Sequence, residues 1–188
     1  MIYLSLKKFL LEEVSNTDGV EVMGNSIFFY PEFEANAYGR ITFTHSIPNF
    51  KSIKDVRTLE PDTPINASGI IILEPDGRIW LRKVANNFGG YVYSFAKGKL
   101  ERGFTAQQNA IKETFEEMGL VCSIQEWLID IQGDTSITRF YLGRRIGGHP
   151  SYIVKQDLQE TDYIVLTDKS TALNMLNRDR DKKILRVV

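Results

Sequence analysis

Residues 98–120 read Gly98-Lys-Leu-Glu-Arg-Gly-Phe-Thr-Ala-Gln-Gln-Asn-Ala-Ile-Lys-Glu-Thr-Phe-Glu-Glu-Met-Gly-Leu120, and they carry most of the information in the chain. The second half predicts a helix on which Glu113 lies three residues before Glu116 and four before Glu117. Residues at these spacings share one side of a helix, so the three carboxylates are expected to crowd together. A solvated acidic face is the simple interpretation. A site for a hard divalent cation such as Mg²⁺, which prefers oxygen ligands, is the alternative.

The ends of this helix are marked by the sequence. Thr105 and Gln108 have the spacing of a capping box, which predicts the helix start, and Gly119 predicts its end. Three apolar residues on the side away from the glutamates are expected to face the core: Ile111, Phe115 and Met118.

Strand patterns surround the helix. The apolar run 68–73, the turn Glu74-Pro-Asp-Gly77 and the alternating run 78–84 predict a β-hairpin. The other predicted strands cover residues 91–95, 123–131, 137–144 and 163–166, and two predicted helices cover residues 167–176 and 179–188. Strands and helices that mix in this way predict an α/β domain.

The first 60 residues have a different pattern. An amphipathic helix is predicted over residues 4–14, and short strands over residues 27–30 and 40–44. Residues 58–66 contain two prolines and are typical of a linker. We therefore place a small α+β N-terminal extension at residues 1–60 and the main domain at residues 61–188.

Composition excludes several classes of protein. The 188 residues hold 23 Lys and Arg against 24 Asp and Glu, and a formal net charge of −1 argues against nucleic acid as the partner. One cysteine and two histidines exclude a disulfide framework and argue against a zinc centre, so any metal is expected to have oxygen ligands. No targeting segment and no apolar run near the roughly 20 residues of a membrane helix is visible, so a cytoplasmic protein with no membrane partner is expected.

The segment resembles the Nudix box, G-x5-E-x7-R-E-U-x-E-E-x-G-U, in which U is aliphatic. Six positions match at the required spacing: Gly98, Glu113, Glu116, Glu117, Gly119 and Leu120. Three positions depart from it: Phe104 replaces the first glutamate, Lys112 the arginine and Thr114 an aliphatic residue. The first two departures fit together, because an arginine that has lost its glutamate partner can be replaced by a smaller cation.

The resemblance implies an α/β fold, namely a Nudix-type α/β/α sandwich with a mixed β-sheet. It also implies a Nudix-family hydrolase acting on phosphoric anhydrides, a metal-dependent pyrophosphohydrolase. Its substrate would be a nucleoside diphosphate linked to another moiety, and its cofactor Mg²⁺ or Mn²⁺. Water would attack one phosphorus atom while the metal neutralises the charge on the phosphoryl oxygens.

The resemblance also assigns roles to residues. Glu116 and Glu117 are expected as principal metal ligands, Glu113 as a ligand or as a base that helps to deprotonate water, and the Gly98 carbonyl as a backbone ligand. These are the catalytic and metal-binding residues that we expect.

Residues outside the box are weaker candidates. Lys97 could hold a substrate phosphate or be a solvated loop lysine, and Arg82 could face the site or solvent. Glu160 and Asp162 are candidates for an additional acid supplied from outside the box.

Two other functions remain open at this level. One is a nucleotide-binding regulatory Nudix-like domain without turnover, against which the intact acid triplet argues. The other is an RNA-end decapping-type hydrolase, against which the net charge argues. The sequence does not identify the substrate, and it leaves the oligomeric state open, with a homodimer among the arrangements that it allows.

Overall fold

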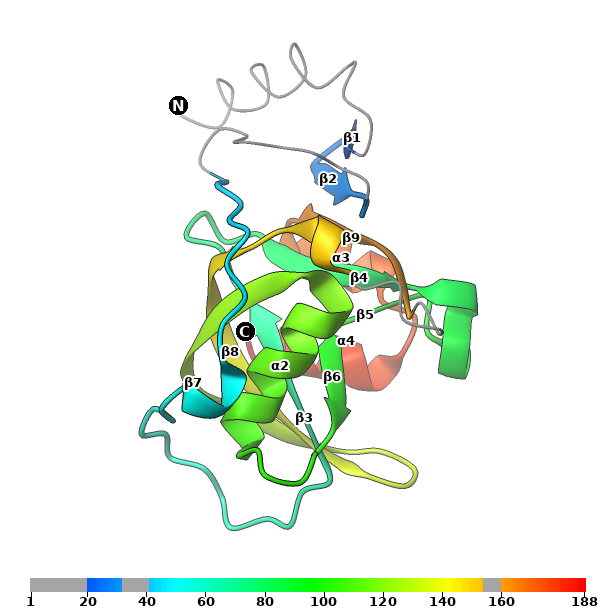
Figure 1. The fold of residues 1–188 in the computed structure, drawn as a ribbon. Coiled ribbons are helices and arrows are strands. Elements are labelled where there is room, and N and C mark those ends of the chain that lie inside the picture. Colours follow the sequence, from blue (N-terminus) through cyan, green and yellow to red (C-terminus); the bar gives the residue numbers. More distant parts are fainter. Residues whose placement is uncertain (1–19, 32–40, 154–159) are drawn as a thin grey trace.

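The computed structural model describes residues 20–31, 41–153 and 160–188, and it contains two β-sheets with helices on both sides (Figure 1). In spatial order, the first sheet contains β1 (Val20–Met23), β2 (Ser26–Phe29), β9 (Thr161–Thr167), β4 (Ile79–Val84) and β5 (Tyr93–Ser94). The second contains β6 (Ala96–Lys99), β3 (Ala67–Ile72), β8 (Ile137–Gly148) and β7 (Leu120–Gln132). The helices are α2 (Ala106–Met118), α3 (Lys169–Met175) and α4 (Asp179–Arg186), with 3₁₀ turns η2 (Phe50–Ser52), η3 (Ala85–Gly90) and η4 (Pro150–Tyr152). The predicted helix over residues 4–14 lies outside the described residues.

The predicted fold class is confirmed. The second sheet is mixed, because β3 pairs in parallel with β8 while β6 and β7 join antiparallel. Helix α2 packs on β3, β6 and β7, and α3 and α4 contact β4 and β7 (Figure 1). The sheets are therefore enclosed between helices, as an α/β/α sandwich requires.

Strand β3 shows how the core is divided. Ile70 and Ile72 point into a cluster that α2 covers, whereas Ile71 points into a second cluster that includes α3 and α4. All three side chains are at most 1% exposed. A strand buried on both faces needs a continuous apolar run, which explains the sequence Ile70-Ile71-Ile72.

The signals at the ends of α2 act as predicted. The Thr105 hydroxyl accepts a hydrogen bond from the Gln108 backbone N–H, and the Gln108 side chain accepts one from the Thr105 N–H, both at 3.1 Å. Gly119 ends the helix with a φ of 71°, which glycine adopts without strain. The three apolar residues predicted to face the core are all buried: Ile111, Phe115 and Met118.

The predicted hairpin over residues 68–84 is wrong. The turn forms, since the Gly77 N–H donates to the Glu74 carbonyl, but the strands on its two sides enter different sheets. A single bridge between Leu73 and Ile79 joins them. The reason is that β3 takes β6 and β8 as partners while β4 takes β5 and β9, so the chain crosses between the sheets at this turn.

Two shorter predictions also need correction. Ile41 makes a bridge, but residues 42–49 are irregular, so the strand predicted over residues 40–44 does not form in its described part. The strand predicted over residues 91–95 is reduced to Tyr93 and Ser94. The predicted linker at residues 58–66 is irregular, as expected. No helix in the described part of the chain is long and apolar enough to cross a membrane.

The boundary between residues 60 and 61 stays a prediction, but many contacts cross it. Strand β2 pairs with β9, and four earlier side chains are buried in the cluster under α2: Ile27, Phe29, Ile41 and Phe43. The Glu60 carboxylate accepts hydrogen bonds from Arg139 at 2.8 Å and from Gln107 at 3.0 Å. The segment before residue 61 therefore contributes to the same core as the rest of the chain.

We expect a chain that starts at Pro61 to lose its cooperative thermal transition. Each of the four buried apolar side chains contributes about 1.5–3 kcal/mol, and a domain has only about 5–15 kcal/mol in total. The reference is a chain that starts at Val20, which keeps every contact among the described residues. Equal melting temperatures of the two chains would contradict this expectation.

Candidate active site

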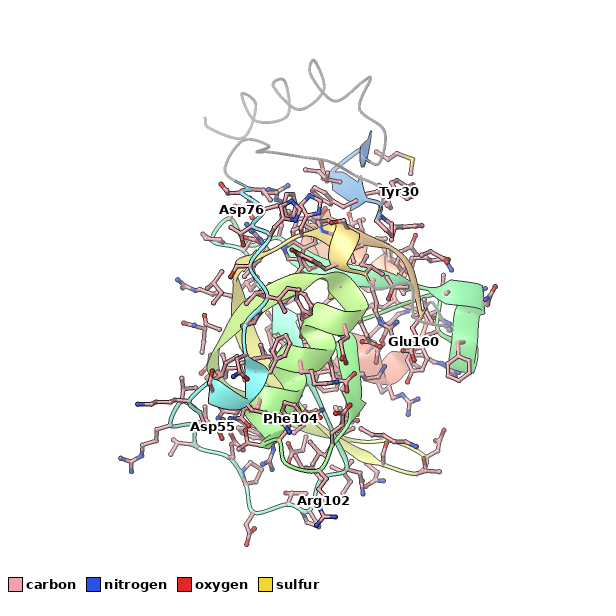
Figure 2. All side chains as sticks on the ribbon, in the orientation of Figure 1. Tyr30, Asp55, Asp76, Arg102, Phe104 and Glu160 are labelled. Carbon is pink, nitrogen blue, oxygen red and sulfur yellow. The ribbon has the colours of Figure 1, made fainter. Side chains whose placement is uncertain are left out.

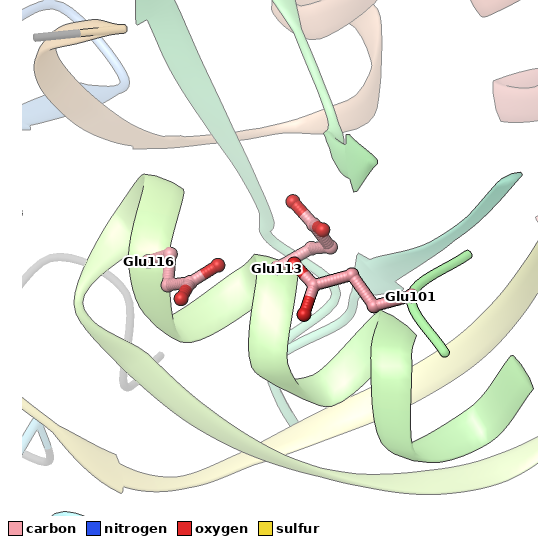
Figure 3. A group of neighbouring side chains, drawn as sticks. All are labelled: Glu101, Glu113 and Glu116. Atoms are coloured by element: carbon pink, nitrogen blue, oxygen red, sulfur yellow. The ribbon is translucent and has the colours of Figure 1, made fainter. Parts of the chain in front are cut away.

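Three carboxylates come together beside α2. Oxygen atoms of Glu101, Glu113 and Glu116 all lie within 4.8 Å of one another (Figure 3). Glu113 and Glu116 are adjacent on the helix, as their spacing predicts, and Glu101 reaches them from the loop between β6 and α2. Three oxygen ligands this close are a set that Mg²⁺ or Mn²⁺ accepts.

Lys112 partly neutralises this cluster. Its Nζ donates to the Glu116 carboxylate at 2.6 Å and to the Glu101 carboxylate at 2.9 Å. The same Nζ lies 6.0 Å from the centre of the Phe104 ring, which Figure 2 places at the start of α2. One lysine therefore holds Glu101 against the helix and fixes its position in the cluster.

The carboxylate of Glu113 packs directly on the backbone of Gly98. A Cβ atom at residue 98 would overlap both carboxylate oxygens of Glu113, so the carboxylate can hold this position only beside a glycine. Burial raises the pKa of Glu113 to about 7, and the charges of Glu116, Glu101 and Glu160 add to the effect, while Lys112 opposes it. Glu113 is therefore an acid that can gain or lose a proton near neutral pH.

Glu117 is not one of the three carboxylates of this cluster, although the charge of Glu113 acts on it. Its Oε1 lies 2.5 Å from an Arg82 guanidinium nitrogen, and its Oε2 accepts a hydrogen bond of 2.8 Å from the Lys97 backbone N–H. The side chain is 6% exposed, and burial raises its pKa despite the opposing pull of Arg82 and Lys97. Glu117 therefore connects α2 to strands β4 and β6.

The comparisons with known proteins agree with this geometry. The sequence model of the NUDIX domain matches residues 63–181. The chain belongs to the NUDIX domain family. No curated protein matches the chain.

Solved structures share the Nudix fold. A NUDIX hydrolase from Nitrosomonas europaea has a TM-score of 0.57 at 13% identity, covering 66% of this chain and 88% of that one. A C. elegans Ap4A hydrolase has a TM-score of 0.51 at 17% identity, covering 64% of this chain and 92% of that one. A UDP-X diphosphatase has a TM-score of 0.51 at 18% identity, covering 68% of this chain and 62% of that one. Family and fold agree with the expected enzyme class, a Nudix-family hydrolase.

The departures from the Nudix box now have a structural explanation. Glu101 supplies to Lys112 the carboxylate that the family pattern places at residue 104, where this chain has Phe104. Thr114 is fully buried, and its hydroxyl donates to the Ala110 carbonyl at 2.8 Å, which satisfies its polar group. The sequence analysis missed Glu101. The available signal was that Lys112 had no partner at position 104 although an acid stood three residues earlier.

The four candidate residues outside the box differ in their relation to the acid cluster. Arg82 is 6% exposed and also donates to the Glu160 carbonyl at 2.9 Å, so in this structure it binds the protein itself. Glu160 is exposed, and its charge acts on Glu113, which favours it as the additional acid (Figure 2). Asp162 is exposed and is not among the charges that act on Glu113. Lys97 lines a separate cavity next to the site.

We expect Gly98→Ala to weaken Mg²⁺ binding by about 10- to 100-fold, as for other changes that displace a metal ligand. The new methyl group forces the Glu113 carboxylate out of its position. Titration of Mg²⁺ by calorimetry measures the effect, and the unfolding temperature without metal checks that the fold is intact. Wild-type affinity in Gly98→Ala would mean that the position of Glu113 does not matter.

The raised pKa of Glu113 predicts two pH effects. The folded state keeps a proton that the unfolded state loses above the ordinary pKa of 4.5, so metal-free stability falls as pH rises toward about 7. Mg²⁺ competes with this proton, so its affinity rises over the same range. Unfolding and Mg²⁺ titrations at about pH 5, 6, 7 and 8 test both, and Glu113→Gln should reduce both slopes. Identical slopes in the variant would assign the proton to another group.

Proposed function

We propose that the chain is a divalent-metal-dependent pyrophosphohydrolase that cleaves a nucleoside diphosphate linked to another moiety. The observation that most supports this is the position of the Glu113 carboxylate, between the backbone of Gly98 and the carboxylates of Glu101 and Glu116. A helix face of solvated acids does not require a glycine on the neighbouring strand. The Nudix family of the chain supports the same reaction class.

The acid cluster would hold Mg²⁺ or Mn²⁺. Glu113 and Glu116 are the ligands for which both sequence and geometry argue, and Glu101 joins them in the structure. The Gly98 carbonyl is a further ligand that the family resemblance implies. The resemblance also implies Glu117, but Arg82 and the Lys97 N–H bind its carboxylate in this structure, so its role as a ligand stays a prediction. A divalent cation bound there neutralises negative charge on the phosphoryl oxygens as the reaction proceeds.

Glu113 is the group that we propose takes the proton. The oxygen of a water molecule forms a bond to one phosphorus atom, the bond from that phosphorus to the bridging oxygen breaks, and two phosphate esters leave. Where Glu113 is not itself bound to the metal, the water proton passes to its carboxylate, whose metal-free pKa of about 7 suits a general base at neutral pH. Glu160, whose charge acts on Glu113, would stabilise the protonated form.

Arg82 and Glu117 position the site. A buried ion pair that also accepts the Lys97 N–H holds α2 at a fixed distance from β6, where Gly98 lies. Removing one partner of such a pair leaves a buried charge, which costs about 3–5 kcal/mol. Arg82 therefore has a structural task, and direct contact between Arg82 and a substrate phosphate stays a prediction.

The partners and location of the enzyme also remain proposals. A net charge of −1 supports a small nucleotide-type substrate in preference to nucleic acid. A cytoplasmic location, the lack of a membrane partner and a homodimer are expectations from the sequence alone.

We expect Glu113→Gln to lower turnover by about 10²- to 10⁴-fold, the range of general acid–base catalysis. Mg²⁺ at about 100 times its Kd should stabilise the wild type by about 2.7 kcal/mol and the variant much less. Without metal, the variant should be as stable as the wild type or more stable, because a buried acid among like charges has gone. Phosphate release and melting curves, with Mg²⁺ and with chelator, measure these effects.

The matched control is Glu126→Gln, which removes an exposed carboxylate on β7 and should change nothing. The substrate panel contains nucleotide sugars, dinucleoside polyphosphates, ADP-ribose, deoxynucleoside triphosphates and a capped RNA. Turnover of the capped RNA alone would support a decapping-type enzyme. Nucleotide binding without turnover of any substrate would contradict the proposal and support a regulatory domain.

A further inference from the structure

A small cavity lies where Lys97 of β6 meets α4 and strands β7 and β8. It has a volume of about 70 Å³, and its polar lining includes Lys97, Thr138, Arg180 and Asp181, with the Tyr91 ring at one side. A single water molecule takes about 30 Å³, so the cavity has room for a larger polar group such as a tetrahedral oxyanion.

Cations gather around the Tyr91 ring. The Lys97 Nζ lies 4.5 Å from the ring centre, and the guanidinium carbons of Arg178 and Arg180 lie at 5.2 Å and 5.4 Å. Three positive charges therefore lie against one aromatic ring at the side of the cavity. Positive charge at this place suits an anionic group.

The two cations that line this cavity, Lys97 and Arg180, have no direct carboxylate partner in the part of the chain that the structure describes. In the described ranges, neither Lys97 nor Arg180 forms an ion pair with a carboxylate within 4.0 Å. Asp181 is the one acid that lines the cavity, and it reaches Lys97 indirectly: Ser94 Oγ donates to Asp181 at 3.0 Å and accepts from Lys97 Nζ at 3.3 Å. Arg178 is not in the lining; its guanidinium donates to the Gly89 carbonyl. Two cations and one carboxylate thus line the cavity, and the buried Glu117 is a second acid whose charge acts on Lys97.

Lys97 joins the cavity to the acid cluster. Its backbone N–H holds Glu117, and the next residue, Gly98, supports Glu113, while its side chain lines the cavity. A ligand whose diphosphate lies at the cluster can therefore place another charged group near Lys97 and Arg180.

We propose that this cavity binds an anionic group of the substrate, and a phosphoryl group is the first candidate. This group is a further one, beyond the two phosphates between which hydrolysis occurs. The inference rests on the proposed function, and it narrows the substrate class. It favours a nucleoside triphosphate, or a diphosphate whose second moiety carries its own phosphate, over a simple nucleoside diphosphate sugar. Arg180 and Lys97 would select such substrates by charge-assisted hydrogen bonds.

The test uses the full chain and inorganic phosphate, in chelator so that no metal site contributes. Calorimetry should detect phosphate binding to the wild type, and Arg180→Gln should weaken it by about tenfold or more, as expected for a hydrogen bond to a charged group. Lys97→Met, which keeps the apolar stem and the backbone N–H, should do the same. The matched control is Arg186→Gln, an exposed charge on the same helix, which should bind phosphate like the wild type.

A kinetic comparison completes the test. Arg180→Gln should raise KM for a deoxynucleoside triphosphate about tenfold while KM for ADP-ribose, which has only two phosphates, stays unchanged. Phosphate affinity equal in the wild type and Arg180→Gln, or no binding to the wild type, would overturn the inference even if the enzyme is active. Loss of phosphate binding in the variant, with no turnover of any substrate, would overturn the proposed function and leave the anion site standing.

Discussion

The ion pair between Arg82 and Glu117 is the contact on which the rest of the site depends. It joins a strand of one sheet to α2, and the Lys97 N–H, from the other sheet, donates to the same carboxylate. Charges this deeply buried are stable only when they are paired and hydrogen-bonded, so the three elements can meet in few other ways. This contact acts together with the buried apolar side of α2 to hold the helix over β6.

Helical spacing then distributes the remaining acids. Once Glu117 points toward the strands, Glu113, one turn earlier, faces Gly98, and Glu116 lies toward the open side with Glu101 and Lys112. Three glutamates that look equivalent in the sequence thus have different surroundings. One binds a protein cation, one is half-buried with a pKa near 7, and one is in contact with a lysine at the surface.

The sequence predicts what depends on local spacing. The caps of α2, its apolar side and the Nudix box all follow patterns within about twenty residues, and the structure agrees with each of them. Prediction from the sequence fails where contacts join distant segments. The two strands beside Gly77 belong to different sheets. The partner of Arg82, Glu117, lies 35 residues further along the chain, and no local pattern indicates it. Glu101 is close to the box in sequence and was still missed. The family pattern expects the acid at residue 104, where this chain has Phe104, three residues after Glu101.

The central claim is that the carboxylates beside Gly98 form a metal site for hydrolysis of a phosphoric anhydride. The most direct measurement is a crystal structure of the protein soaked in Mn²⁺, with the metal located by anomalous scattering. We predict a peak within coordination distance of Glu113 and Glu116, about 2.0–2.3 Å from their oxygens, which disappears in Glu113→Gln. A peak elsewhere, or full occupancy in the variant, would contradict the account.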